Sequence, residues 1–241
     1  MNNYKIEISY DGSSFHGFQK QVSVRTVQSE IEDSLKLIIK DYELNYAGRT
    51  DAGVHARSQI LSLKTSQNLN PSFFNSLDSL LGHEIKIKKF QKVKNSFHPR
   101  FESKSRVYKY FIQGNDKGSP YNRNYRYLVR TPIELSQLKS IEKIFVGKKN
   151  FKNYSKLRKD QDPYREISKS EWSKSNDYFI YTIEGNSFLH NLVRSIVGCQ
   201  LAVLENKVTK KELKESLQQP QKTRFNFIAP AHGLYLWKIK Y

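Results

Sequence analysis

The chain has almost no cysteine, few acidic residues and no long apolar run. Cys199 is the only cysteine among 241 residues, which excludes an internal disulfide and a zinc site built on thiolates. The six histidines lack the spacing of metal ligands, so we expect no bound metal. No apolar stretch approaches the roughly 20 residues that span a bilayer, and the N-terminal segment lacks the apolar core of a signal peptide. These absences predict a cytoplasmic protein that makes no membrane span.

Acidic residues are outnumbered by basic ones. The 41 Lys and Arg residues face 23 Asp and Glu residues, so the formal net charge is +18 at pH 7. This excess predicts a polyanionic partner, with nucleic acid as the first candidate and an anionic membrane surface as the second. Hydrophobic residues make up 37% and aromatic residues 13%, which argues against disorder and allows a sizeable core. We therefore expect a folded protein that binds RNA.

The spacing of apolar residues predicts two halves, 1–100 and 101–241, each with the element order β-α-β-β-α-β. In the first half we expect strands at 4–10, 42–46, 58–64 and 84–94, with helices at 27–40 and 71–81. In the second half we expect strands at 106–113, 166–173, 178–184 and 234–241, with helices at 135–145, 187–204 and, as a short addition, 210–217. The predicted fold class is α+β. Its two split-βαβ halves, of the ferredoxin and RNA-recognition type, are expected to place antiparallel sheets side by side and to form a basic central cleft.

The run of residues 47–56 places one carboxylate, Asp51, close to two glycines, with Arg49 and His55 nearby. Glycine permits tight backbone turns and close approaches, and a glycine-flanked loop around a single acid is typical of an active site. The alternative is a hairpin turn with a solvated Asp, because Asp and Gly dominate turns for local reasons. On the first interpretation Asp51 is catalytic and His55 supports the loop beside the substrate.

The segment 10–19 combines aromatic residues with glycines directly after the first predicted strand. Phe15 and Gln19 are candidates for contacts with bases and phosphates, and a plain glycine turn is the alternative. Nothing in the segment indicates that Asp11 is a second catalytic acid.

Arg106, Tyr108 and Tyr110 alternate along a predicted strand and therefore share one face. Such a face can stack a base and hold a phosphate. The alternative is an ordinary half-buried strand, since tyrosine favours strands in any case.

Arg194 lies inside the apolar helical pattern of residues 186–198. A buried guanidinium needs a partner, and Asp51 is the acid that we expect, with an arginine that reaches solvent as the alternative. His190, in the same segment, is expected to pack in the helix.

A dense basic run is interleaved with Phe151 and Tyr154, and its solvated cations are candidates for contact with an RNA backbone. Its members are Lys148, Lys149, Lys152, Lys156, Arg158 and Lys159.

These motifs, together with a closing segment at 231–236, resemble the bacterial tRNA pseudouridine synthase I family in the same order along nearly the whole chain. The resemblance implies a homodimeric enzyme that isomerises uridine to pseudouridine at positions 38, 39 and 40 in the anticodon arm of tRNA. It implies that Asp51 is catalytic, that Arg194 forms an ion pair with it, and that Tyr108 stacks on the target uracil. An isomerisation has no redox step and no group donor, so no cofactor is expected.

We also expect specific contacts with the substrate. Arg49 would fill the space that a flipped nucleotide vacates or hold its phosphate. The residues expected to bind substrate are Arg49, Tyr108, Arg106, Tyr110, Phe15, Gln19 and His55.

Two segments depart from the family pattern, and several alternatives stay open. Residues 80–85 lack the Leu-Pro pair that the family often has, and Asp162 stands where a threonine is expected. The residues do not distinguish whether Asp51 attacks the sugar, attacks the base or abstracts a sugar proton. Another RNA as substrate is one alternative, and a non-catalytic RNA-binding protein on the same fold is another. The second would have no need for Asp51, Tyr108 and Arg194 together.

Overall fold

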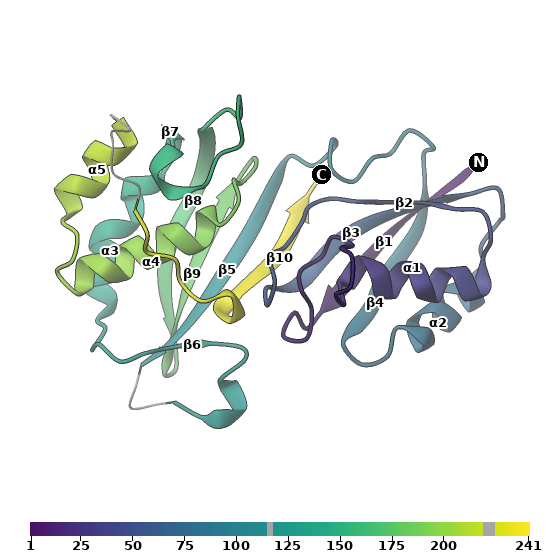
Figure 1. Ribbon diagram of the computed structural model, residues 1–241, viewed down its shortest axis with the longest axis horizontal. Helices are drawn as coiled ribbons and strands as arrows, with labels where there is room; N and C mark the ends of the chain where they lie inside the picture. The colour runs from purple at the N-terminus through teal and green to yellow at the C-terminus, as the bar shows by residue number, and fades with distance from the viewer. Residues whose placement is uncertain (115–117, 219–224) are drawn as a thin grey trace. The chain divides into compact units, whose positions relative to one another are not determined.

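The computed structural model describes residues 1–114, 118–218 and 225–241 (Figure 1). The chain forms two compact units, one made of residues 1–104 with 235–241 and the other of residues 105–234. Each unit combines helices with β-strands, so the predicted α+β class is confirmed. The division differs from the predicted one in the last strand, which the sequence assigned to the second half and which packs in the first unit.

The first unit has the predicted order β-α-β-β-α-β. Its elements are β1 (Asn2–Tyr10), α1 (Val27–Ile38), β2 (Glu43–Tyr46), β3 (His55–Thr65), α2 (Pro71–Leu80), β4 (Ile85–Val93) and the late strand β10 (Leu234–Lys240). Strands β4, β1, β3 and β2 pair antiparallel in that order. Strand β10 adds to β3 in parallel at residues 235–236. The sheet is therefore mixed rather than wholly antiparallel. After the 130 residues of the other unit, the chain returns as β10, which runs parallel to β3, whereas β1 runs antiparallel to β3.

The core of the first unit lies between its sheet and helices α1 and α2 (Figure 1). Alternate residues of β1 point to this face, and Tyr4, Ile6 and Ile8 are each buried. The register sets Tyr4 opposite Leu63 and Ile6 opposite Leu61, so β3 contributes to the same face.

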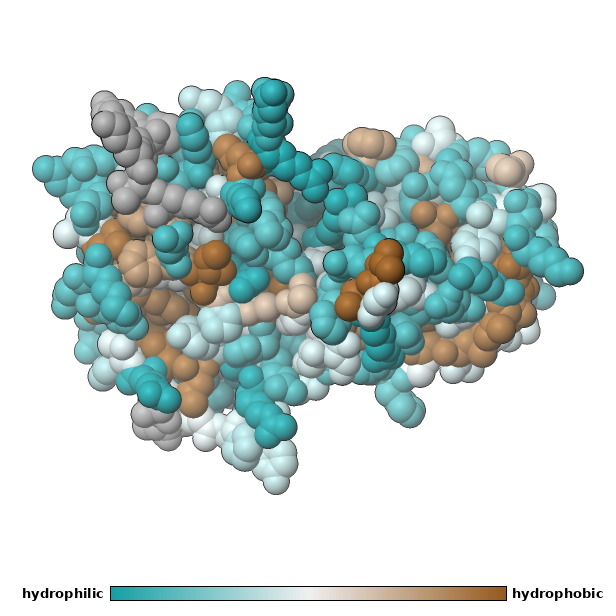
Figure 2. Space-filling model, in the orientation of Figure 1, coloured by the Kyte–Doolittle hydropathy of each residue, from teal (hydrophilic) through white to brown (hydrophobic). Residues whose placement is uncertain are grey.

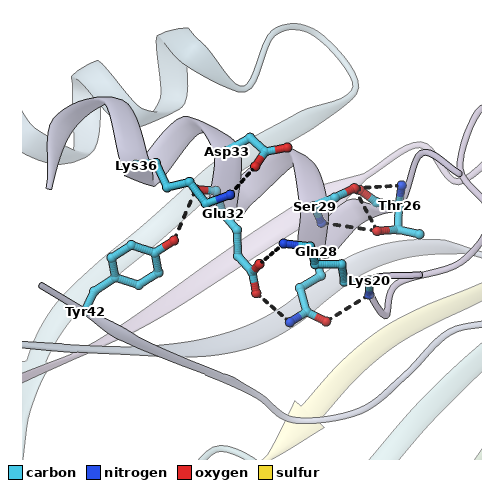
Figure 3. Close-up of polar contacts among 8 residues, drawn as sticks. All are labelled: Lys20, Thr26, Gln28, Ser29, Glu32, Asp33, Lys36 and Tyr42. Atoms are coloured by element: carbon cyan, nitrogen blue, oxygen red, sulfur yellow. Dashed lines mark hydrogen bonds and ion pairs between the residues drawn. The ribbon is translucent and has the colours of Figure 1, made fainter. Parts of the chain in front are cut away.

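Helix α1 begins with reciprocal capping bonds (Figure 3). The Thr26 hydroxyl oxygen accepts the Ser29 N–H at 3.2 Å, and the Thr26 N–H donates to the Ser29 hydroxyl oxygen at 3.0 Å. These bonds satisfy backbone donors that the first turn of a helix leaves without partners. The helix ends at Ile38, two residues before the predicted end, because Ile39 already has extended backbone angles.

The second unit contains more elements than the sequence predicted. Its elements are β5 (Ser105–Gly114), η2 (Pro120–Asn122), β6 (Tyr127–Val129), α3 (Leu135–Glu142), η3 (Lys143–Phe145), β7 (Gly147–Asn150), η4 (Lys152–Tyr154), β8 (Tyr164–Ser175), β9 (Tyr178–Gly185), α4 (Leu192–Leu204), α5 (Lys210–Gln218) and η5 (Ala231–Gly233). Strands β5, β9, β8 and β7 pair antiparallel in that order, and β6 pairs with β5 in parallel. The short strands β6 and β7 were not predicted, because three or four residues are too few to show an alternation of apolar and polar side chains.

Helix α4 starts five residues later than predicted. Asn191 has φ 59 and ψ 3, a left-handed conformation that cannot continue an α-helix toward its N-terminus. Residues 187–191 therefore form a loop that leads into α4. His190 is exposed in this loop, so its predicted packing in the helix is wrong.

Buried polar side chains join the helices of the second unit to its sheet. The Trp172 indole N–H donates to Gln200 Oε1 on α4 at 2.7 Å, and the hydroxyl groups of Ser170 and Tyr181 lie 2.6 Å apart. Burial raises the pKa of Tyr181 well above its usual value, so the phenol stays neutral. Paired polar groups of this kind fix one arrangement of a core.

Hydrophilic residues cover most of the visible face of each unit, with smaller hydrophobic patches between them (Figure 2). Within the described residues, no helix has both the length and the hydrophobicity to cross a membrane.

The α1 cap makes a testable contribution to stability. We expect Thr26→Ala to lower the free energy of unfolding by about 1 kcal/mol, because the exchange removes the side-chain cap. Urea unfolding followed by circular dichroism measures the change. The control is Asp33→Asn, which removes only an exposed ion pair with Lys36 and should leave the midpoint unchanged. Equal midpoints for Thr26→Ala and the wild type would contradict the role of the cap.

Candidate active site

Asp51 is half-buried in the loop that connects β2 to β3. Backbone and side-chain bonds hold both ends of this loop. The Ala47 N–H donates to the Ile60 carbonyl at 2.9 Å, and the Gln59 side-chain amide donates to the Gly48 carbonyl at 2.7 Å. The Val54 N–H closes a turn onto the Asp51 carbonyl at 3.1 Å. Gly53 supplies the positive φ of 75° that this turn requires.

A second loop, residues 11–18, packs directly on the Asp51 loop. The Phe18 N–H donates to the Thr50 carbonyl at 3.1 Å, and the Gly53 N–H donates to the Phe15 carbonyl at 3.3 Å. The hydroxyl groups of Tyr10 and Thr50 lie 2.7 Å apart. The two loops therefore form one hydrogen-bonded body around Asp51.

Two glycines allow this close approach. A Cβ atom added to Gly12 would lie 2.1 Å from the Val54 carbonyl oxygen, far inside contact distance. A Cβ atom on Gly17 would lie 2.9 Å from the Thr50 carbonyl oxygen, and Gly17 has φ +91°. Neither position accepts a side chain unless the Asp51 loop moves. Sequence analysis singled out this glycine-rich segment but did not anticipate that it supports the Asp51 loop.

His55 supports the same loop pair. Its ring is 1% exposed, stacks on Tyr235 with a centroid distance of 4.5 Å, and accepts the Gly12 N–H on Nδ1 at 3.0 Å. The Asp11 carboxylate lies 3.2 Å from the same Nδ1 atom. His55 thus packs between strand and loop, and its contact with substrate stays a prediction.

The other candidate substrate-binding residues of the first unit differ in their exposure to solvent. Phe15 is 3% exposed, and the Arg25 guanidinium lies 4.5 Å above its ring. Phe15 thus packs inside its loop, and the prediction that its ring meets a base is wrong. Arg49 is exposed beside Asp51, and Gln19 is half-buried.

The three candidates on β5 lie on one face, as predicted, but only two remain near the surface. Tyr110 is fully buried, and its hydroxyl donates to the Pro230 carbonyl at 2.7 Å. Its role as a substrate contact is therefore wrong, because Gly233 packs on the same ring. Tyr108 is 9% exposed and packs edge-on against Phe188, with centroids 5.1 Å apart.

Arg106 lies at the start of the same strand and is half-buried. Its guanidinium donates to the Asn186 carbonyl at 2.7 Å. This bond ties the strand to the loop that leads into α4.

Arg194 is half-buried on α4 and is oriented by neutral oxygens. Its Nε donates to the Ala229 carbonyl at 2.8 Å, and its Nη1 donates to Asn191 Oδ1 at 3.0 Å. The Ala229 N–H in turn donates to the Arg194 carbonyl at 3.1 Å. Gly198, one turn along, lets residues 227–228 lie against the helix, since a Cβ there would meet the Phe227 carbonyl oxygen at 2.4 Å. These bonds set the position of the guanidinium without neutralising its charge. Asp51 belongs to the first unit, so its pairing with Arg194 stays a prediction.

The basic run of residues 148–159 divides into core and surface. Phe151 and Tyr154 are buried and pack edge-on against each other. The alternation of these aromatic residues with lysines therefore arises because the two rings anchor the short β7–η4 segment in the core. The buried rings are unavailable to RNA. The lysines and Arg158 are left at the surface or half-buried.

Comparison with known proteins matches the whole chain to one family. The profile of the family described as tRNA pseudouridine synthase matches residues 7–102 and 141–241. The chain is 38% identical over 245 residues to tRNA pseudouridine synthase A of Dictyoglomus thermophilum, with 100% of each chain covered. It is 35% identical over 248 residues to tRNA pseudouridine synthase A of Borreliella afzelii, again with 100% of each chain covered.

A relative from another bacterial genus agrees. The chain is 32% identical over 245 residues to tRNA pseudouridine synthase A 1 of Bacillus cereus, covering 100% of this chain and 99% of the relative. A profile match over both halves and relatives of equal length support the same conclusion. The chain belongs to the tRNA pseudouridine synthase family.

Proposed function

We propose that this enzyme converts uridine to pseudouridine in the anticodon arm of tRNA, at positions 38, 39 and 40, with Asp51 as the essential carboxylate. The observation that carries the proposal is the support of Asp51 by two interlocked loops whose contact depends on Gly12 and Gly17. A catalytic group must be held within a fraction of an ångström of its target, and a solvated Asp in a plain turn would need no second loop.

The reaction is balanced without a co-reactant. The glycosidic bond between N1 of the target uracil and the sugar breaks, the uracil is retained and turned, and its C5 forms a bond to the same sugar carbon. C5 loses one proton and N1 gains one, so the product is an isomer of the substrate. The target must first leave the helical stack, at a cost of a few kcal/mol. Arg49, exposed beside Asp51, is suited to hold the displaced nucleotide's phosphate.

Two residues of the second unit complete the proposed chemistry. Tyr108 stacks on the uracil, and the Phe188 ring fixes its orientation from one side. Arg194 pairs with Asp51 and orients its carboxylate through charge-assisted hydrogen bonds. Bonds to the Ala229 carbonyl and to the Asn191 side chain orient the guanidinium for this task.

The substrate is recognised first through charge. A net charge of +18 predicts binding that weakens steeply with salt, as phosphate contacts release counterions. The homodimeric state that the family resemblance implies is part of the same proposal.

The experiment that tests the function compares wild type with Asp51→Asn on bulk tRNA from cells that lack this gene. We expect carbodiimide primer extension to show new stops in the anticodon arm with the wild type alone, because the amide neither attacks nor accepts a proton. The control is Asp41→Asn, an exposed acid ten residues earlier, which should stay active. Stops with Asp51→Asn would remove Asp51 from the chemistry. Retention of tRNA by both proteins without stops would favour a non-catalytic RNA-binding protein or another RNA substrate.

The proposed ion pair gives a second prediction. Arg194→Met should abolish turnover while tRNA still binds within a few-fold of wild type, because Asp51 loses the cation that orients it. Arg194→Lys should recover part of the activity. Lys207→Met, an exposed cation just beyond α4, serves as the control and should stay active. A fully active Arg194→Met enzyme would refute the pairing.

The interlocked loops give a third prediction. Gly12→Ala must displace the Val54 carbonyl and with it the Asp51 loop, so we expect kcat to fall at least about tenfold with little change in the Kd for tRNA. The control is Gly82→Ala, at a glycine with φ +68° and no atom within 4 Å of an added Cβ. That change should cost roughly 1–2 kcal/mol of stability and leave kcat unchanged. Normal kcat in Gly12→Ala would show that the contact does not position Asp51.

A further inference from the structure

Arg165, at the start of β8, carries a charge that its surroundings do not neutralise. Its side chain is 14% exposed, and its Nη1 donates to the carbonyl oxygens of Asp162 and Tyr164. Its Nε is buried and has no acceptor within the described part of the chain. The Asp162 carboxylate lies 3.9 Å from Nη1, and that carboxylate is 70% exposed. A solvated acid at that distance gives little compensation.

The neighbour of Arg165 across the sheet is another cation. Lys149 on β7 is directly opposite Arg165 in the antiparallel register, so the two side chains share a face. Burial lowers the pKa of Arg165, which reflects the cost of taking its charge out of water. Two cations side by side with one of them largely buried are expensive unless an anion joins them.

A purely structural role does not explain why an arginine occupies position 165. The turn before β8 is already closed, because Asp162 Oδ1 accepts the Tyr164 N–H at 2.9 Å. The Phe151 N–H also donates to the Pro163 carbonyl at 3.1 Å, which ties the same turn to the neighbouring segment. The guanidinium therefore adds two bonds to carbonyl oxygens that the turn does not depend on.

We propose that Arg165 and Lys149 together bind a phosphodiester group of the RNA substrate. The proposal rests on the proposed function, since it takes RNA as the ligand. The guanidinium presents paired donors to phosphate oxygens, and the lysine adds a point charge. Such a contact positions the RNA and reads no base. The surface cations of the basic run, from Lys148 to Lys159, continue the same electropositive segment.

The test measures binding of bulk tRNA by filter retention over a series of KCl concentrations. Arg165→Met should weaken binding about tenfold at low salt and make the slope of log K against log[KCl] shallower by about 1. KM should rise with kcat unchanged, and the urea midpoint should stay the same or rise, because a poorly compensated cation has been removed. Lys149→Met should change Kd and slope in the same direction by less.

The control is Lys169→Met on the same strand, which removes a cation that Glu171 already neutralises at 2.6 Å. It should leave Kd and slope near wild type. Identical slopes for Arg165→Met and Lys169→Met would overturn the proposal, and so would a lower urea midpoint with an unchanged slope, which is the mark of a structural role. Binding is measured without turnover, so a wild type that binds tRNA but forms no pseudouridine would refute the proposed function alone.

Discussion

The proposed active site depends on one close contact between two stretches of backbone. Gly12 and Gly17 bring residues 11–18 against the Asp51 loop at distances that no side chain permits. Hydrogen bonds from Phe18 and Gly53 then join the loops, and the buried His55 ring holds the Gly12 amide. The β-strands beneath supply only the ends of both loops. A half-buried carboxylate on a rigid pair of loops is the arrangement that a covalent or proton-abstracting role requires.

The arginines of the second unit follow a common principle. Arg106, Arg165 and Arg194 each donate to neutral carbonyl or amide oxygens. Bonds of this kind restrict the rotamers of a long side chain. A protein that must meet a polyanion gains from cations that are already in place, since less side-chain entropy is lost when the ligand binds. The high net charge supplies attraction at a distance, and the oriented arginines supply position.

Sequence patterns located most elements but not all of their limits or roles. Helix α1 was predicted from its apolar spacing and is present, with reciprocal capping bonds at Thr26. The start of α4 was misplaced because apolar residues continue through 188–189, whereas the left-handed Asn191 ends the helix. Phe15 and Tyr110 were taken for RNA contacts because an aromatic residue has the same spacing whether it meets a ligand or a core. Burial alone separates the two cases.

The sequence by itself determined the family, the α+β class and the basic character, because these depend on residue types and local order. Only the tertiary structure decided which glycines bring two loops into contact, that the last strand joins the first unit, and that Lys149 lies across the sheet from Arg165. Those properties arise between residues far apart in the chain. No local pattern records how closely two backbones approach or which charge lies across a strand.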